Sequence, residues 1–86
     1  MHERALMDDV VGKVLAVAEA ERATRVVGIR VRLGALSHFT PEHFAEHWAD
    51  ACKGTVAEGA EVEATVDSDV TGDAAQGVVL ESIEVA

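Results

Sequence analysis

The sequence is poor in aromatic residues and in cysteine. Among its 86 residues there are two Phe, one Trp and no Tyr, although 49% of the residues are hydrophobic. A core made from this chain must therefore consist mainly of Val, Leu, Ile and Ala. The single cysteine, Cys52, excludes an internal disulfide and a zinc site built from Cys-x-x-Cys pairs. At this length we expect residues 1–86 to form one domain.

Basic residues and long apolar runs are scarce as well. The chain has 16 acidic and 7 basic residues, which give a formal net charge of -9 at pH 7. Such a charge repels nucleic acids and anionic lipids, so neither is an expected partner. The apolar runs are far too short to cross a bilayer, and the N-terminus lacks the basic and then apolar pattern of a signal peptide. We therefore expect a soluble cytoplasmic protein that makes no membrane contact.

Residues 4–22 carry apolar side chains at helical spacing. This pattern is the broad stripe of a helix that packs on a sheet. Because the predicted helix starts directly after His2 and Glu3, it would hold the amino terminus in place. The main row of the stripe is Leu6, Val10, Val14 and Val17, broadened by Met7, Val11, Leu15 and Ala18.

Residues 24–33 change to a period of two, which predicts a strand. Arg30 and Arg32 share one face. We expect them to lie on a solvated sheet surface, paired with acidic residues of a neighbouring strand, rather than to bind an anion. The opposite, core-facing side of the strand carries Val27, Ile29, Val31 and Leu33.

A second helix is predicted to open at Thr40-Pro41-Glu42. Thr40 is a suitable N-cap, and proline fits the first helical position. The helix ends at Lys53-Gly54, where glycine can adopt the left-handed conformation of a C-terminal cap. Its predicted buried face consists of Phe44, Trp48, Ala51 and Cys52, with Cys52 serving as a small hydrophobic residue rather than a reactive thiol or a metal ligand.

Two further strands follow, over residues 60–66 and 78–85. The first alternates cleanly, with Val62, Ala64 and Val66 facing inward. In the second, a change of parity predicts a β-bulge near Glu81-Ser82. The polar segment 67–77 between them contains three aspartates but lacks the spacing of an EF-hand loop, so we expect a solvated loop rather than a calcium site.

These elements predict an α/β (α+β) fold with the order α-β-α-β-β. The helix between the first two strands permits a right-handed crossover with those strands parallel, and the short final connection makes the last two antiparallel. The expected architecture is a small mixed three-stranded sheet with both helices packed on one face. No nucleophile with a base and an orienting group is visible, nor a glycine-rich phosphate loop, so we do not expect an enzyme.

The first three residues, Met1, His2 and Glu3, can form a metal chelate. The terminal amine, the His2 amide and the His2 imidazole would close fused five- and six-membered rings on one ion. Glu3, a residue folded in from elsewhere or water would fill the fourth position. Nitrogen-rich, tetragonal ligation of this kind suits Ni(II) or Cu(II) better than Zn(II). From these residues alone, a histidine at position 2 is more often an ordinary exposed terminal residue.

His43 and His47 form a second candidate for metal binding. They are four residues apart on the second predicted helix, so both imidazoles could reach one ion. Helical geometry places His47 beside the apolar stripe and His43 further out. The pair lacks the internal glutamate of a zinc protease motif, and two surface histidines can share this spacing by chance.

Taken together, the motifs resemble those of the HypA family, the nickel metallochaperones of [NiFe]-hydrogenase and urease maturation. The matching segments cover about 1–66 and 78–86, nearly the whole chain. They read M-H-E, R-V-V-G-I-R-V-R-L-G-A-L-S, P-E-H-F, C-K-G-T-V-A-E-G-A-E-V-E and S-I-E-V.

The resemblance implies nickel binding at the N-terminus and transfer of nickel to a hydrogenase large subunit, together with a GTPase partner of the HypB kind. His2 would be the principal ligand through its imidazole and backbone amide, and Glu3 would add its amide or support the site. His38 lies in a loop that approaches this site in the family, so we include it as a further candidate ligand.

One feature departs from the family pattern. The family normally carries a zinc module with two Cys-x-x-Cys pairs between the last two strands, and here residues 67–77 take its place. We therefore expect no structural zinc. The alternative function is a metal-independent interaction module derived from such a chaperone, which docks on a partner or forms a homodimer through a sheet edge.

Overall fold

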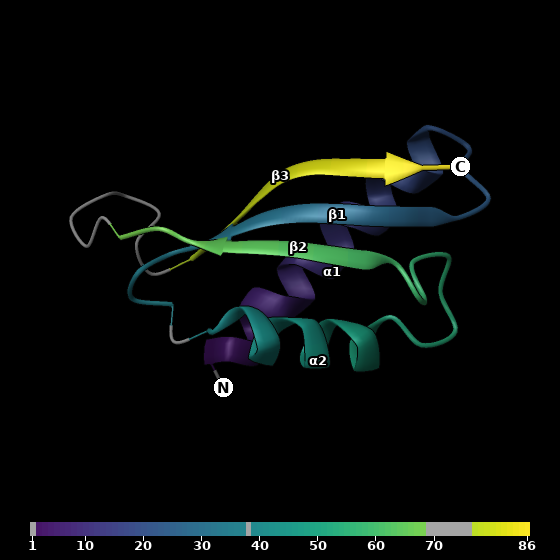
Figure 1. Cartoon of the computed structure of the whole chain (residues 1–86). Helices are drawn as coiled ribbons and strands as arrows, with labels where there is room; N and C mark the ends of the chain where they lie inside the picture. The colour runs from purple at the N-terminus through teal and green to yellow at the C-terminus, as the bar shows by residue number, and fades with distance from the viewer. Residues whose placement is uncertain (1, 38, 69–76) are drawn as a thin grey trace.

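The structure, a computed structural model, describes residues 2–37, 39–68 and 77–86, and for residues 2 and 3 it describes the backbone only. The observed order is the predicted one, helix, strand, helix, strand, strand (Figure 1). The elements are α1 (His2–Ala20), β1 (Val26–Leu33), α2 (Pro41–Ala51), β2 (Glu61–Val66) and β3 (Val78–Val85).

The three strands form one mixed sheet in the order β2-β1-β3. β1 and β2 are parallel, as a crossover through α2 requires, and β1 and β3 are antiparallel. The predicted strand directions are therefore confirmed. The sequence pattern did not identify the neighbours, however, because β3 pairs with the first strand rather than with β2, which precedes it along the chain.

The bulge predicted in the last strand is present at Glu81. Ser82 pairs with Arg30 and Leu80 pairs with Val31, so Glu81 is the extra residue in β3. The additional residue restores the apolar side chains on both sides of it to one face, which explains the change of parity in the sequence.

A second irregularity lies in β1, between Val26 and Gly28. It places Val26 in the core with 1% of its surface exposed, while Val27 is only partly buried. The prediction that Val27 belongs to the core-facing row was therefore wrong. An irregularity of this kind shifts the alternation of the residues before it, and the period of two in β1 gave no sign of it.

Both helices pack against the same face of the sheet, as predicted, with α1 in contact with β3 and α2 in contact with β2 (Figure 1). The predicted burial of two residues was wrong, because Val17 is 41% exposed and Ala51 is exposed. Val66 also departs from its predicted inward position and is 53% exposed at the end of β2. The buried cluster comprises Met7, Val10, Val14, Ala18, Val26, Ile29, Val31, Leu33, Phe39, Phe44, Trp48, Cys52 and Ala57.

The N-terminal cap of α2 follows the prediction. The Thr40 hydroxyl accepts a hydrogen bond from the His43 backbone N–H at 3.1 Å, and Pro41 is the first helical residue. Gly54 and Gly59 both have positive φ angles, of 80° and 81°, which only glycine adopts without strain. These residues fix where the α2 segment starts and how the chain then turns back to β2.

The other face of the sheet carries the predicted arginine pairs. The Arg30 Nε atom lies 3.1 Å from a Glu63 carboxylate oxygen on β2. Arg32 lies 3.7 Å from Asp67 and 3.6 Å from Glu81. These groups are partly exposed, so each pair contributes at most about 1 kcal/mol. The predicted ion pairs with acidic residues are confirmed.

The C-terminus of α1 ends in a left-handed cap made without glycine. Arg22 has a φ angle of 53°, and its N–H donates to the Glu19 carbonyl at 3.0 Å. The Ala23 N–H donates to the Ala18 carbonyl at 2.9 Å, which completes the Schellman pattern. A residue with a Cβ atom is strained in this conformation by about 1 kcal/mol relative to glycine.

We therefore expect Arg22→Gly to raise the free energy of unfolding by about 0.5–1 kcal/mol, because glycine removes the strain at the cap. Urea denaturation followed by circular dichroism measures the change. Arg22→Ala is the matched control, since it removes the same side chain but keeps the Cβ atom. Equal stabilisation by both substitutions would show that the arginine side chain, and not its backbone conformation, is the unfavourable feature.

Candidate metal centre

The first turn of α1 contains two of the predicted nickel ligands. The helix begins at His2, two residues earlier than predicted. The first N–H groups of a helix have no acceptor within the helix. The amide nitrogens of His2 and Glu3 could therefore bind a metal ion without breaking a helical hydrogen bond. Met1, His38 and the side chains of His2 and Glu3 lie outside what the structure describes, so the complete ligand set remains a prediction.

The start of α1 lies at the same end of the molecule as the connection from β1 to α2 and the first turn of α2 (Figure 1). The two helices also contact each other. Within the connection, the Ser37 N–H donates to the Gly34 carbonyl at 3.0 Å, and the buried Ser37 hydroxyl lies 3.4 Å from the Phe39 N–H. These contacts fix the backbone on both sides of residue 38, the position of the further candidate ligand.

The two histidines of α2 are brought together. The ring centres of His43 and His47 are 4.5 Å apart, and the ring planes meet at 73°. His43 also contacts the Phe39 ring, with 5.6 Å between the ring centres. One helix face therefore holds two imidazoles within reach of each other.

The relative burial of this pair is the reverse of the predicted one. His43 is half-buried and His47 is exposed. Helical periodicity alone puts His47 closer to the apolar stripe, but Phe39 comes from the segment before the helix and covers the His43 ring. Such a contact from outside a helix cannot be inferred from the spacing of residues within it.

Within the ranges 4–37, 39–68 and 77–86, no group of three or more His, Cys, Asp or Glu side chains is placed to hold one metal ion. Cys52 is fully buried, and burial raises the pKa of its thiol, an effect partly offset by a hydrogen bond with Thr55. A buried, protonated thiol is a poor nucleophile and a poor metal ligand. The predicted role of Cys52 as a small core residue agrees with its position. The three aspartates weighed above as a calcium site fall mainly on residues 69–76, outside the described residues.

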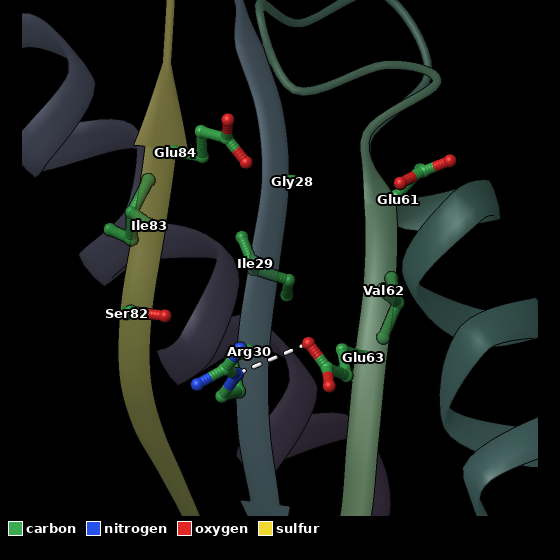
Figure 2. A pocket seen from close by; sticks show the side chains of 9 residues that line it. All are labelled: Gly28, Ile29, Arg30, Glu61, Val62, Glu63, Ser82, Ile83 and Glu84. Carbon is green, nitrogen blue, oxygen red and sulfur yellow. Dashed lines mark hydrogen bonds and ion pairs between the residues drawn. The ribbon is translucent and has the colours of Figure 1, made fainter.

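A shallow groove of about 520 Å³ on the open face of the sheet was not anticipated (Figure 2). Gly28 lines it on the central strand β1, between Glu61 on β2 and Glu84 on β3. A Cβ atom at residue 28 would lie 3.3 Å from the Glu61 carbonyl oxygen, which is a tight contact. The alternation of β1 already placed Gly28 beside Arg30 and Arg32, but the flanking glutamates depend on strand pairing that the pattern did not supply.

Comparison with known proteins identifies the family of this chain. Residues 1–72 match the family model described as HypA, hydrogenase/urease nickel incorporation, metallochaperone. The chain belongs to the HypA family. A hydrogenase maturation factor HypA from Archaeoglobus fulgidus is 39% identical over 67 residues, which are 78% of this chain and 61% of that protein. The HypA of Thermococcus kodakarensis is 43% identical over 63 residues, covering 73% of this chain and 45% of its own.

The chain thus spans about half the length of the HypA proteins it matches. The family description names nickel incorporation by a metallochaperone, and a metallochaperone binds and transfers a metal ion rather than catalysing a reaction. The maturation of a hydrogenase also implies protein partners for the family. In the part of the chain that the structure describes, no helix is long and apolar enough to cross a membrane.

Proposed function

We propose that this HypA-family chain binds one Ni(II) ion at its amino terminus and releases it to a nickel enzyme during maturation. The terminal amine of Met1, the His2 amide nitrogen and the His2 imidazole supply three nitrogen ligands. The Glu3 amide or carboxylate, His38 or water supplies the fourth. The observation that carries this proposal is the start of α1 at His2, which leaves the relevant amides without helical acceptors in a chain of a nickel-incorporation family.

Anchoring by α1 favours binding because it lowers the entropy cost of ordering a chain terminus. Met7 and Val10 are buried only one or two turns into the helix, so the residues that precede them are held near the protein surface. The net charge of -9 also attracts a divalent cation. Because the amine, amide and imidazole ligands belong to the first two residues, the ion could pass directly to an acceptor protein.

The proposed acceptor is a hydrogenase large subunit, or the corresponding urease component, with a GTPase of the HypB kind as a further partner. The proposal includes no structural zinc, since Cys52 is the only cysteine and lies in the core. The second candidate function is a metal-independent docking module. The uncovered groove around Gly28 favours that alternative, because a partner could rest on this face of the sheet.

Hydrogenase or urease activity in cells that lack this chain distinguishes the two functions. In low-nickel medium, we expect the wild-type gene to restore activity and His2→Ala to fail. Excess nickel should restore activity both in cells without the chain and in cells that carry His2→Ala. Glu84→Arg, which reverses the charge of an exposed side chain that lines the groove, serves as the contrasting variant. If His2→Ala restores activity and Glu84→Arg does not, the chain acts by docking and the proposed nickel function is wrong.

A further inference from the structure

We propose that His43 and His47 form a second, open binding site for a divalent transition-metal ion on α2. The inference rests on the proposed function only for the choice of nickel as the natural ion. Binding by the histidine pair itself rests on geometry. Each imidazole would supply one nitrogen to the ion.

The distance between the rings fits a shared ion. A histidine nitrogen lies about 2.0–2.1 Å from a bound ion, and its ring centre about 1.1 Å further away. Each ring centre would therefore be about 3.2 Å from the ion. If the angle between the two bonds at the ion is about 90°, the ring centres are about 4.5 Å apart. The observed separation of 4.5 Å between the ring centres of His43 and His47 is compatible with this distance.

One histidine is held in place and the other is accessible. His43 is half-buried against Phe39, so its ring loses little freedom when an ion binds. His47 is exposed and can receive an ion from solvent. Glu42 and Glu46, both exposed on the same helix, add negative charge nearby.

Two imidazoles are by themselves fewer ligands than the four of a structural zinc site. No third His, Cys, Asp or Glu side chain joins it among the described residues. An ion held by two protein ligands exchanges more readily than one held by a full set, since fewer bonds must break at once. The pair lies on α2, whose first turn is at the same end of the molecule as the start of α1 (Figure 1). A site of this kind suits capture of nickel before transfer to the amino terminus.

Thermal unfolding in nickel chloride tests the pair. Four proteins are compared, namely wild type, His2→Ala, His47→Gln and the double variant. In the His2→Ala background, saturating nickel should raise the melting temperature by about 5 °C through binding to the folded state. Adding His47→Gln should raise the apparent Kd at least about tenfold, because one of the two chelating ligands is lost. At a nickel concentration that saturates His2→Ala, the double variant should therefore show only a small part of this shift.

The matched control moves the second imidazole to another face of α2. His47→Gln combined with Ala49→His keeps the number of histidines and uses an exposed position, but separates the two rings. This protein, in the His2→Ala background, should behave like the double variant. If nickel stabilises the double variant or the control as strongly as His2→Ala, the histidine pair is not a site. Failure of the amino-terminal site is recognised separately, since wild type and His2→Ala would then respond alike.

Discussion

Replacing Trp48 with alanine should lower the free energy of unfolding by about 3–5 kcal/mol, the usual cost of emptying a large buried aromatic site. Trp48 is 1% exposed and stacks on Phe44, with ring centres 6.3 Å apart and an interplanar angle of 17°. A chain of 86 residues has a typical stability of about 4–13 kcal/mol. The substitution should therefore leave much of the protein unfolded at moderate temperature.

The measurement is urea denaturation followed by far-ultraviolet circular dichroism, because Trp48 is the only tryptophan and its fluorescence is lost with it. Trp48→Phe is the informative control. It keeps an aromatic ring and removes the buried Nε1 group, which has no hydrogen-bond partner among the described residues. We expect it to cost less than half as much as alanine. Equal losses for the two variants would mean that the ring contributes little to the packing of α2.

The second large effect concerns nickel. His2→Ala should weaken binding of the first Ni(II) ion by about 100-fold or more, equivalent to about 2.7 kcal/mol. The substitution removes the imidazole and with it the six-membered ring of the chelate, so the remaining amine and amides compete poorly with water. The fold should be unaffected, since the described core begins at Met7. Competition with a coloured nickel chelator measures the loss.

A protein with one glycine added before Met1 is the companion control. It retains His2 but converts the terminal amine of Met1 into an amide, so it should lose a large part of the affinity as well. If the extended protein binds nickel as tightly as the natural one, the terminal amine is not a ligand. The circular dichroism spectra of both variants should match that of the wild type.

The regular elements were predictable because each has a local signal. The crossover through α2 follows from a helix between two strands, and the Thr40 cap follows from the residues that open this helix. The bulge at Glu81 was predictable because apolar residues flank it at the wrong parity. In each case the information lies within a few neighbouring residues.

The errors came from contacts between distant segments. The irregularity at Val27 depends on the register of β1 with β3, and the central place of β1 depends on both of its neighbours. Phe39 covers His43, and this contact reverses the order of burial that helical spacing suggests for the two histidines. Burial at the edge of an element, as for Val17 and Val66, likewise depends on what the rest of the chain covers.

The candidate site was only partly accessible to sequence reasoning. The possible chelate of Met1, His2 and Glu3 can be inferred from the sequence, because these ligands come from consecutive residues. The start of α1 at His2 adds the reason why their amides are available. The close approach of His43 and His47 required side-chain positions, since residues at this spacing can also point apart.

Calorimetric titration of the natural protein with Ni(II) at neutral pH, beside His2→Ala, tests the central claim most directly. We predict one tight site per chain in the natural protein and loss of that site in His2→Ala, with only the more weakly held ion of the α2 histidine pair remaining. Tight binding of equal strength and stoichiometry in both proteins would contradict an amino-terminal nickel site.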